Sequence, residues 1–589
     1  MMQSRCSFVV PLCFCFAIIL LFYPYLAISS CITSDKNWQS FTNTNFVRGI
    51  AIGNFHIFTA TTMGINQYHK DTRAWEKTLT TTNGLLDNDV NVVAVDRGAV
   101  SFNIGQPQWI GQQQGVAPTD TLWCVTRKGI TSYDPKAGIW KNYTRKDGVG
   151  EEDIVSIGIT DNYILFESDK EICCWYNKSM SSMEVGTLTM PEKVKWFGKK
   201  DNTMEILLKT GTITSLYYEP MNGMRYRFSC AAMDNHYLWL GTWGGGIYDY
   251  DINTNEWKQQ INGLKTKEAA LIASDGTSIW IAGQSKSNNL TDSGITCYTP
   301  FDNQWNYIYR SEKANATNTI GSNWVTCLLP EDNIIWFGYQ GGVSRYDTSS
   351  KQWLSFTKKN TLIDGNVKAI VNDKDSVWVI TRWGINRFCR LSDRWSPSGG
   401  ESPSGRGSPS GGGSPSGRKS TSGKWEQYLY PLELSKNGEY LTAAVVYDNA
   451  LWTAFSWLGV YRFEYQTGKW EQIDLPEGFE KSYIYCFMPD CDGLWFGTDR
   501  GVLRLSNQSW ESLTEQDGII SNKVFCINKN DEYVFFGTSS GVSSYCKQDG
   551  WIRNYTMNDG LIDNDIRSIA ISEHCVYFGT PVGMTAFYW

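Results

Sequence analysis

Hydrophobic and polar residues alternate with a period of two along most of the chain, and glycine-bearing turns interrupt the alternation. Residues 494–505 show the unit: an apolar run through Trp495 and Phe496, a turn ending at Gly501, and a second run. A period of two is expected when one face of a sheet is buried. Gly501 can adopt the positive φ that a tight hairpin requires. The pattern predicts β-hairpins, and no long segment has helical periodicity.

The hairpin recurs along the chain, with most spacings in the low forties. Each copy has one aromatic or apolar core anchor: Phe58, Trp123, Phe166, Leu208, Trp239, Trp280, Trp336, Trp378, Trp452, Trp495, Phe536 and Phe578. A full unit adds a Trp-led strand, a turn and a short apolar strand, which makes four strands. Such a period is the signature of a β-propeller blade. We predict an all-β protein of about twelve four-stranded blades, in two rings of six or of seven and five.

The last unit lacks its fourth strand, and residues 37–41 provide a strand of that type at the start of the chain. We therefore predict that the N-terminal strand completes the last blade and closes the second ring, which removes two exposed strand edges. The predicted divisions are an export signal at 1–31, a first propeller at 32–318 and a second at 319–589. Ser-Pro-Ser-Gly hexads fill 396–423, which predicts a disordered loop, either a tandem expansion or a tether to a partner.

The N-terminal segment predicts export. Arg5 precedes an apolar run from about Phe8 to Ile28, as in a signal sequence. Residues 28–31, Ile-Ser-Ser-Cys, resemble the lipobox of bacterial lipoproteins, in which Cys31 would be acylated. Ordinary cleavage and an uncleaved anchor are the alternatives. We expect a protein of the periplasm or cell surface, held at the membrane by an N-terminal lipid or anchor.

Twelve cysteines follow the export signal, yet the repeat argues against a disulfide framework. Cys327, Cys486 and Cys526 occupy one slot that other repeats fill with Ala, Ser or Val. Such a slot requires a small buried side chain, and a free cysteine behaves as one. We expect most of the thiols to be unpaired, with Cys491 and Cys575 as the exceptions to test.

The repeat as a whole resembles the two-component regulator propeller repeat. The resemblance is carried by Leu-Trp-Phe-Gly-Thr…Gly-Val…Arg-Leu at 494–505, by Asp-Gly-Ile-Ile-Ser-Asn-Lys-Val at 517–524, and by matching segments at 238–248 and 335–343. It implies paired propellers that form the exported sensor half of a histidine-kinase receptor, many of which respond to glycans. The sequence departs from that arrangement because it ends at Trp589 without a later membrane span, kinase or DNA-binding segment. We therefore expect a separate signalling partner.

Function is expected on the loops at one end of the propeller. The hairpin tips between second and third strands should converge there with the turns that carry Asn88, Asn366, Asn522 and Asn564. The tips hold the candidate ligand-binding residues, which are Trp243, Trp383, Trp457, Arg127, Arg382 and Arg500. Aromatic faces stack on sugar rings and arginine binds carboxylates in two places, so a polar glycan, acidic ones included, is the first ligand to test. Alternatively, the tryptophans pack between blades and the arginines are solvated.

Catalytic signals are weak. The histidines are scattered and show no metal-ligand spacing; they are His56, His69, His236 and His574. Neither a Gly-x-Ser-x-Gly elbow nor a phosphate loop is found. We predict no catalytic residue, no metal site and no enzyme. The predicted function is a ligand-binding or sensor-like module for a glycan or protein; the alternatives are a scaffold for protein assembly and a polysaccharide lyase.

The net charge of the chain further limits the classes of binding partner. The net charge is −7 with no basic cluster, which excludes a nucleic-acid partner. Asp87 and Asp563 could add oxygen ligands for Ca²⁺, but no dense acidic cluster accompanies them. We therefore predict no cofactor. The recurrence of asparagine in the same turns is explained by structure alone, because Asx side chains stabilise turns through hydrogen bonds to the backbone.

Overall fold

The computed structural model describes residues 37–97, 120–149, 153–169, 171–185, 188–191, 193–218, 225–234, 237–283, 294–310, 319–390, 424–431, 434 and 441–589. Within these ranges the chain forms eleven antiparallel sheets and the short α-helix α2 (Thr203–Lys209). The all-β, multi-blade propeller prediction is confirmed. The described part of the chain has no helix with the length and apolar character needed to cross a bilayer.

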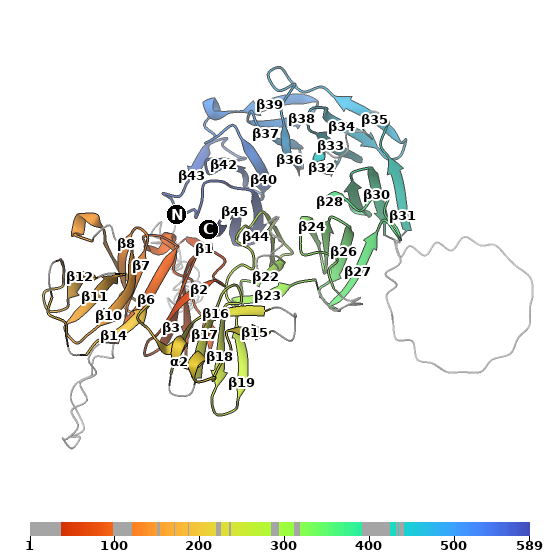
Figure 1. Ribbon diagram of the computed structural model, residues 1–589. Coiled ribbons are helices and arrows are strands. Elements are labelled where there is room, and N and C mark those ends of the chain that lie inside the picture. Colours follow the sequence, from red (N-terminus) through yellow and green to blue (C-terminus); the bar gives the residue numbers. More distant parts are fainter. Residues whose placement is uncertain are drawn as a thin grey trace, which may run out of the picture.

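Seven sheets form a closed ring (Figure 1). Their strands are β20 (Leu271–Ser274), β21 (Ile279–Ala282), β22 (Ile295–Thr299), β23 (Gln304–Ile308); β24 (Val325–Glu331), β25 (Ile334–Tyr339), β26 (Gly342–Asp347), β27 (Gln352–Thr357); β28 (Val367–Asn372), β29 (Ser376–Thr381), β30 (Gly384–Cys389), β31 (Lys424–Leu429); β32 (Leu441–Tyr447), β33 (Ala450–Phe455), β34 (Gly459–Glu464), β35 (Lys469–Ile473); β36 (Ile484–Asp490), β37 (Gly493–Thr498), β38 (Val502–Ser506), β39 (Ser509–Leu513); β40 (Val524–Lys529), β41 (Tyr533–Thr538), β42 (Val542–Cys546), β43 (Ile552–Tyr555); and β44 (Ser568–Ser572), β45 (Cys575–Thr580), β46 (Gly583–Tyr588) with β1 (Trp38–Phe41). The innermost strands contact one another in the order β20, β24, β28, β32, β36, β40, β44 and again β20. We refer to this body as the seven-sheet ring.

The two ends of the chain share one sheet of the ring. Strand β1 pairs with β46, and Trp38 lies opposite Phe587. The Trp38 indole is 5% exposed and lies 4.6 Å from the ring of Phe587 and 5.6 Å from that of Tyr555 in the neighbouring sheet. The predicted completion of the last blade by the N-terminal strand is therefore confirmed.

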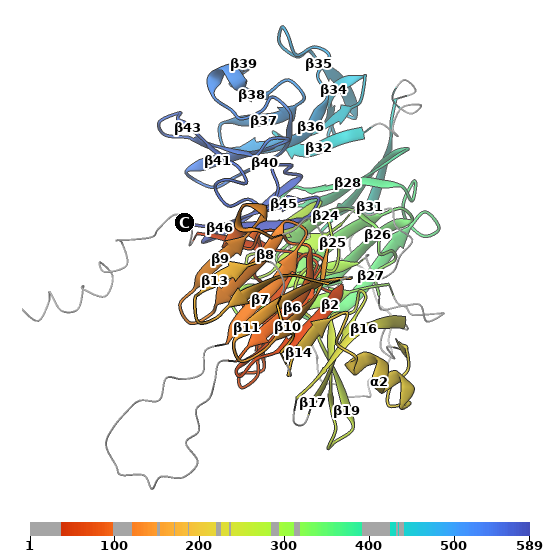
Figure 2. The same cartoon turned by 60° about the vertical axis from the view of Figure 1, so that its left-hand side comes forward.

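The other four sheets form a second body beside the ring (Figure 2). Their strands are β2 (Val47–Ile52), β3 (His56–Thr61), β4 (Gly64–His69), β5 (Ala74–Trp75); β6 (Val90–Asp96), β7 (Thr121–Thr126), β8 (Gly129–Asp134), β9 (Ile139–Tyr143); β10 (Ile154–Ile159), β11 (Tyr163–Ser168), β12 (Ile172–Asn177), β13 (Ser182–Glu184), β14 (Lys195–Gly198); and β15 (Leu216–Tyr218), β16 (Arg225–Met233), β17 (Tyr237–Thr242), β18 (Ile247–Asp251), β19 (Glu256–Gln260). Neighbouring sheets meet through β16, β2, β6 and β10, and β14 contacts both β6 and β2. We refer to this body as the four-sheet unit.

The division between the two bodies differs from the predicted boundary at 318 and 319. Strand β20 contacts β24 on one side and β44 on the other, so residues 271–308 belong to the seven-sheet ring. The predicted polar connection after residue 310 therefore joins two sheets of one ring. Among the described residues the arrangement is seven sheets and four, in place of six and six or seven and five.

One of the twelve predicted core anchors does not lie in a strand. Leu208 belongs to α2 and is 39% exposed. Met204 and Leu207, three residues apart on one helix face, pack against the cluster that contains Phe228 of β16. Glu205 and Lys209 pair at 2.5 Å across one helical turn. Helical spacing of apolar residues explains why this segment is a helix.

Two short segments connect the bodies, and they bond to each other. Residues 42–46 lead from β1 to β2, and residues 261–270 lead back from β19 to β20. Asn43 Nδ2 donates to the Lys265 carbonyl at 2.9 Å, and Asn45 Nδ2 donates to the Leu264 carbonyl at 2.9 Å. Lys265 is 1% exposed, and its ammonium lies 5.1 Å from the ring centre of Tyr309. The junction is thus a buried, hydrogen-bonded crossing.

Indoles fill the space between neighbouring sheets, as predicted. Trp336 is 1% exposed and contacts Phe388 of the next sheet at 5.6 Å. Trp378 is fully buried and lies 5.0 Å from Tyr465, again in the next sheet. Each such ring hides on the order of 200 Å² of apolar surface. One sheet alone could not bury both of its faces, so the stack of sheets is the folding unit.

The glycine that follows the core anchor in several repeats is required by close approach of three strands. A Cβ on Gly497 would lie 2.6 Å from Cys486 Sγ and 2.9 Å from the Val524 carbonyl oxygen of the next sheet. The small slot predicted for Cys486 therefore faces the repeat glycine. All twelve cysteines after Cys31 lie in described residues and are free, and Cys491 is exposed. Burial raises the pKa of the Cys486 thiol to about 12.

Three predictions fall outside the described residues: the export signal at 1–31, acylation of Cys31, and the disordered loop at 396–423. They stay predictions.

One buried carboxylate joins two sheets of the ring. Asp490, at the end of β36, has a side chain that is 4% exposed. It pairs with Lys529 of β40 at 2.8 Å and with Lys547 at 2.9 Å. Burial opposes ionisation, but the hydrogen bonds from the two lysines and from the Cys491 amide outweigh it and hold the pKa of Asp490 well below its usual range.

We predict that Asp490→Asn lowers the free energy of unfolding by about 2–4 kcal/mol at pH 7, because two half-buried ammonium groups lose their counter-charge. A carboxylate with a depressed folded-state pKa stabilises the protein above its unfolded pKa of about 4, and the contribution disappears as the pH falls below that value. The difference between wild type and variant should therefore shrink between pH 5 and pH 2. Urea unfolding at several pH values measures it.

The matched control is Asp531→Asn, an exposed carboxylate on the turn between β40 and β41. That variant should change stability little at any pH. A pH-independent loss for Asp490→Asn would contradict the electrostatic explanation.

Candidate functional site

The six predicted ligand-binding residues all lie at hairpin turns, five of them between the second and third strands of a sheet and Trp243 between the third and fourth strands of a five-stranded sheet. Arg127 follows β7 and Trp243 follows β17, both in the four-sheet unit. The other four belong to three consecutive sheets of the ring, and they are Arg382 and Trp383 after β29, Trp457 after β33 and Arg500 after β37. The structure therefore divides the predicted set between two bodies.

Trp243 lines a pocket of about 520 Å³ close to the crossing segments. It is 46% exposed and meets Phe46 edge to face at 5.3 Å. Arg127 lies nearby but is engaged by Asp89 at 3.2 Å, and the same carboxylate pairs with Arg48 at 2.7 Å. Trp243 thus presents an aromatic surface, whereas Arg127, which is 72% exposed, shares the single Asp89 carboxylate with Arg48.

Arg382 and Trp383 cover each other. The guanidinium of Arg382 lies 4.9 Å from the ring centre of the Trp383 indole, which is 41% exposed. Arg500 donates to the Gly478 carbonyl at 3.0 Å. In neither case does the arginine extend freely toward a ligand, so these tips favour aromatic contact over bidentate carboxylate binding.

Trp457 is the most exposed indole among the described residues. It is 92% exposed, and its φ is 71°, in the left-handed region. That conformation costs a residue with a Cβ on the order of 1–2 kcal/mol. Burial of the indole does not offset this backbone strain, and such outliers concentrate at functional sites.

A pocket of about 700 Å³ lies between the tip at Trp457 and the start of the next sheet. Leu458, Tyr483 and Tyr485 give it an aromatic and apolar part. The polar part holds Gln472, Asp474, Glu480, Lys481, Ser482 and Asp499. We call this pocket, together with Trp457, the Trp457 pocket.

The polar groups of the Trp457 pocket are partly fixed and partly available. Asp499 accepts the Tyr483 amide at 2.8 Å, so it holds the strand start in place. The Ser482 hydroxyl is buried and has no hydrogen-bond partner among the described residues. Burial raises the pKa of Tyr483 and of Tyr485, which keeps both phenols neutral hydrogen-bonding groups. Neutral donors and acceptors beside aromatic faces suit a polyhydroxylated ligand.

A feature that sequence reasoning missed continues from this pocket. The innermost strands of five ring sheets carry a β-bulge at the same place, and the bulged residues are Thr326, Lys368, Thr442, Tyr485 and Phe525. A bulge leaves one residue out of the ladder and redirects its side chain. Tyr485 and Phe525 contact each other at 5.1 Å across neighbouring sheets, and Arg567 covers Phe525 at 4.3 Å. In the sequence, the bulged position is the variable residue directly before the small buried slot that Cys486 occupies in its repeat.

The predicted convergence of the two loop sets is confirmed. The Ser539 amide at one hairpin tip donates to the Lys523 carbonyl in the asparagine turn, and the Arg382 amide donates to the Asn366 carbonyl. The bulges lie at the same end, because each adjoins the strand start that faces a tip. Tips, turns and bulges therefore share one face of the ring.

The asparagines of these turns act as scaffolding. Asn522 Oδ1 accepts the amide of Glu515, the first residue of the 3-10 helix η6 (Glu515–Asp517), at 2.8 Å. Asn564 and Asn88 each accept the corresponding amide at 2.8 Å, and the Asn88 bond goes to η2 (Thr81–Asn83). Asn366 instead donates its amide to Asp364 at 3.2 Å.

The two aspartates considered for Ca²⁺ also serve the turns. Asp87 accepts the Asp89 amide at 3.1 Å, and Asp563 accepts the Asp565 amide at 3.0 Å. Lys128 lies 3.2 Å from the other oxygen of Asp87. These contacts explain both residues without an ion.

Comparison with known proteins gives remote likenesses. No family model matches the chain. A histidine kinase P4 from Formosa agariphila is 26% identical over 172 residues, which are 27% of this chain and 12% of that protein. The extracellular domain of the hybrid two-component system BT3049 from B. thetaiotaomicron is 16% identical, with 91% of this chain and 73% of that chain covered and a TM-score of 0.42. PorZ, a surface component of the type-IX secretion system of Porphyromonas gingivalis, is 12% identical, with 94% and 87% covered and a TM-score of 0.38.

We predict that Trp457→Gly is more stable than Trp457→Ala by about 1 kcal/mol, because glycine adopts a φ of 71° without a Cβ clash. Both variants should retain the wild-type fold, since the indole is exposed. Urea unfolding of the two variants measures the difference. Equal stabilities, or a more stable alanine variant, would contradict the strain at this tip.

Proposed function

We propose that this chain is an exported, sensor-like recognition module that binds a polar glycan at the Trp457 pocket. The single observation that carries the proposal is the exposed, strained indole of Trp457 at the edge of a pocket with neutral hydrogen-bonding groups. An indole face packs against the C–H face of a sugar, while the two tyrosines offer hydrogen bonds to hydroxyls.

The charges in the pocket favour a neutral glycan over an acidic one. Asp474, Glu480 and Asp499 bring three carboxylates, and Lys481 brings one cation. A carboxylated sugar would meet more repulsion than attraction there. Arg567, which covers the neighbouring bulge at Phe525, is paired with Asp565 at 2.6 Å. We therefore propose a neutral oligosaccharide as the ligand class.

Exposure of the predicted tryptophans separates this proposal from a scaffold for protein assembly. A scaffold predicts that Trp243, Trp383 and Trp457 are buried between sheets. They are 46%, 41% and 92% exposed. The surfaces that a glycan would need are therefore accessible.

A polysaccharide lyase is the second candidate, and one observation favours it. Asp474, Glu480, Lys481 and Tyr483 line a single pocket, and such enzymes combine carboxylates with Lys or Tyr. The same binding experiment distinguishes the two, because a lyase shortens the bound oligosaccharide whereas a recognition module releases it intact.

The location and partners belong to the same proposal. We propose export through the segment at 1–31, attachment to the membrane through Cys31 or an uncleaved anchor, and a separate signalling partner. Metabolic labelling with a fatty acid, with Cys31→Ser as the comparison, tests the attachment.

The direct test is a glycan array screened with the mature chain, followed by titration of the best neutral oligosaccharide. Trp457→Ala should weaken binding at least tenfold, a loss of about 1.4 kcal/mol. The matched control is Phe301→Ala, which removes a 96% exposed ring from the turn between β22 and β23, at the opposite face of the ring. The proposal fails if no glycan binds, or if the two variants bind equally well.

A further inference from the structure

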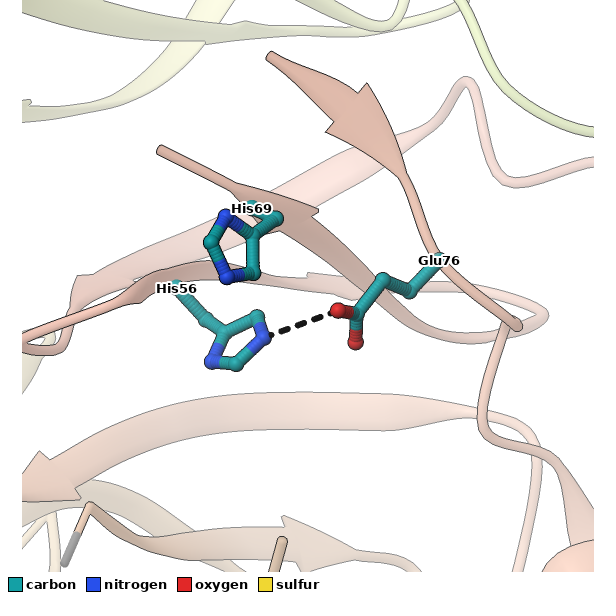
Figure 3. Close-up of side chains that lie close together, drawn as sticks. All are labelled: His56, His69 and Glu76. Carbon is teal, nitrogen blue, oxygen red and sulfur yellow. Dashed lines mark hydrogen bonds and ion pairs between the residues drawn. The ribbon is translucent and has the colours of Figure 1, made fainter. Parts of the chain in front are cut away.

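A cluster of possible metal ligands lies in the four-sheet unit, far in sequence from the Trp457 pocket. His56 begins β3 and His69 ends β4, and the register of this hairpin places them directly opposite each other. Strand β5 adds to β4 with Ala74 opposite His69, so that Glu76 follows on the third strand (Figure 3). The prediction that the histidines are scattered is wrong for His56 and His69. The hairpin corrects this, because positions symmetric about its turn become neighbours.

The ligand atoms are close enough for one ion. His56 Nε2 lies 3.1 Å from Glu76 Oε1, and the two imidazoles meet edge to face with centres 4.9 Å apart. One ligand atom from each residue lies within 4.8 Å of the others. Tetrahedral zinc, bound at about 2.0–2.1 Å, separates its ligands by about 3.4 Å. Small side-chain adjustments of about 1 Å would therefore complete the geometry.

The surroundings leave the cluster both ordered and accessible. The His56 side chain is 16% exposed and that of Glu76 is 42% exposed. The Thr72 amide donates to His69 Nδ1 at 3.3 Å, which orients the ring with its other nitrogen toward His56 (Figure 3). Binding of a metal at that nitrogen places the ring proton on Nδ1 and gives up this long hydrogen bond, a cost of about 1 kcal/mol.

We propose that His56, His69 and Glu76 bind a divalent transition-metal ion of the zinc type. Two imidazoles and one carboxylate are a common donor set for Zn²⁺ with three protein ligands, and the fourth position stays open to water or an external ligand. Histidines fixed on paired strands are preorganised, so little side-chain entropy is lost on binding.

The position of the cluster gives the ion a structural effect. Strand β5 has only two residues, and the chain around it contacts the seven-sheet ring: Asn303 Nδ2 donates to the Trp75 carbonyl at 3.0 Å, and Lys77 Nζ to the Trp38 carbonyl at 3.3 Å. An ion that joins Glu76 to β3 and β4 would hold this edge in place. Because it binds the folded chain, it would also raise the unfolding temperature.

The test is calorimetric titration of the mature chain with Zn²⁺, using protein without a histidine tag. One ion should bind per chain, and His56→Asn, His69→Asn and Glu76→Gln should each lower the affinity at least about tenfold. The matched control is His574→Asn, which removes an 81% exposed histidine and should leave the affinity unchanged. Thermal unfolding without metal verifies that each variant is folded.

Cobalt provides a second readout. Co²⁺ bound by these three residues should give the visible absorption of a tetrahedral or five-coordinate site, and His56→Asn should abolish it. Absence of Zn²⁺ binding, or binding that is unchanged in His56→Asn and His69→Asn, would overturn the proposal. In that case His56 and Glu76 form a hydrogen-bonded pair only.

Discussion

The pairing of the first strand with the last is the contact on which the seven-sheet ring depends. Trp38 packs against Phe587 within its own sheet and against Tyr555 of the preceding one. Without β1, the last sheet would expose the free edge of β46 and the indole-filled space beneath it. An open edge of this kind pairs with other chains. Ring closure therefore protects the sheet edges and fixes the order of all seven sheets.

Closure also determines how the two bodies are connected. The chain leaves the ring at once after β1, forms the four-sheet unit, and returns to begin β20. Asn43 and Asn45 bond the outgoing segment to the returning one, and Lys265 is buried among tyrosines beside them. The four-sheet unit is thus inserted into one ring. Movement of the unit would have to disturb these buried hydrogen bonds, so its position is coupled to the closing sheet.

Much of the fold could be predicted because each strand repeats the same local pattern. The anchors Trp336 and Trp495 predict buried strands, and the missing strand of the last repeat predicts that the N-terminal strand closes the ring. Leu208 was wrongly predicted to lie in a strand. An apolar residue at the expected distance from the previous repeat does not show whether its neighbours follow the period of a strand or of a helix. The ring boundary was missed because sheets of both bodies have the same sequence pattern. The boundary is set by contacts between β20 and β44, two strands that lie far apart in the sequence.

The candidate site was predictable only in part. Trp457 was identified from its place at a hairpin tip, but its exposure and positive φ depend on three-dimensional context, as does the bulge that redirects Tyr485. Hydrogen exchange tests the central claim of closure most directly. The amides of Trp38–Phe41 that face β46 should be protected from exchange to a degree similar to their partners in Gly583–Tyr588, because the two strands share one ladder, whereas the amides on the outer side of β1 should exchange rapidly. Rapid exchange of every amide in 38–41 beside a protected 583–588 would contradict it.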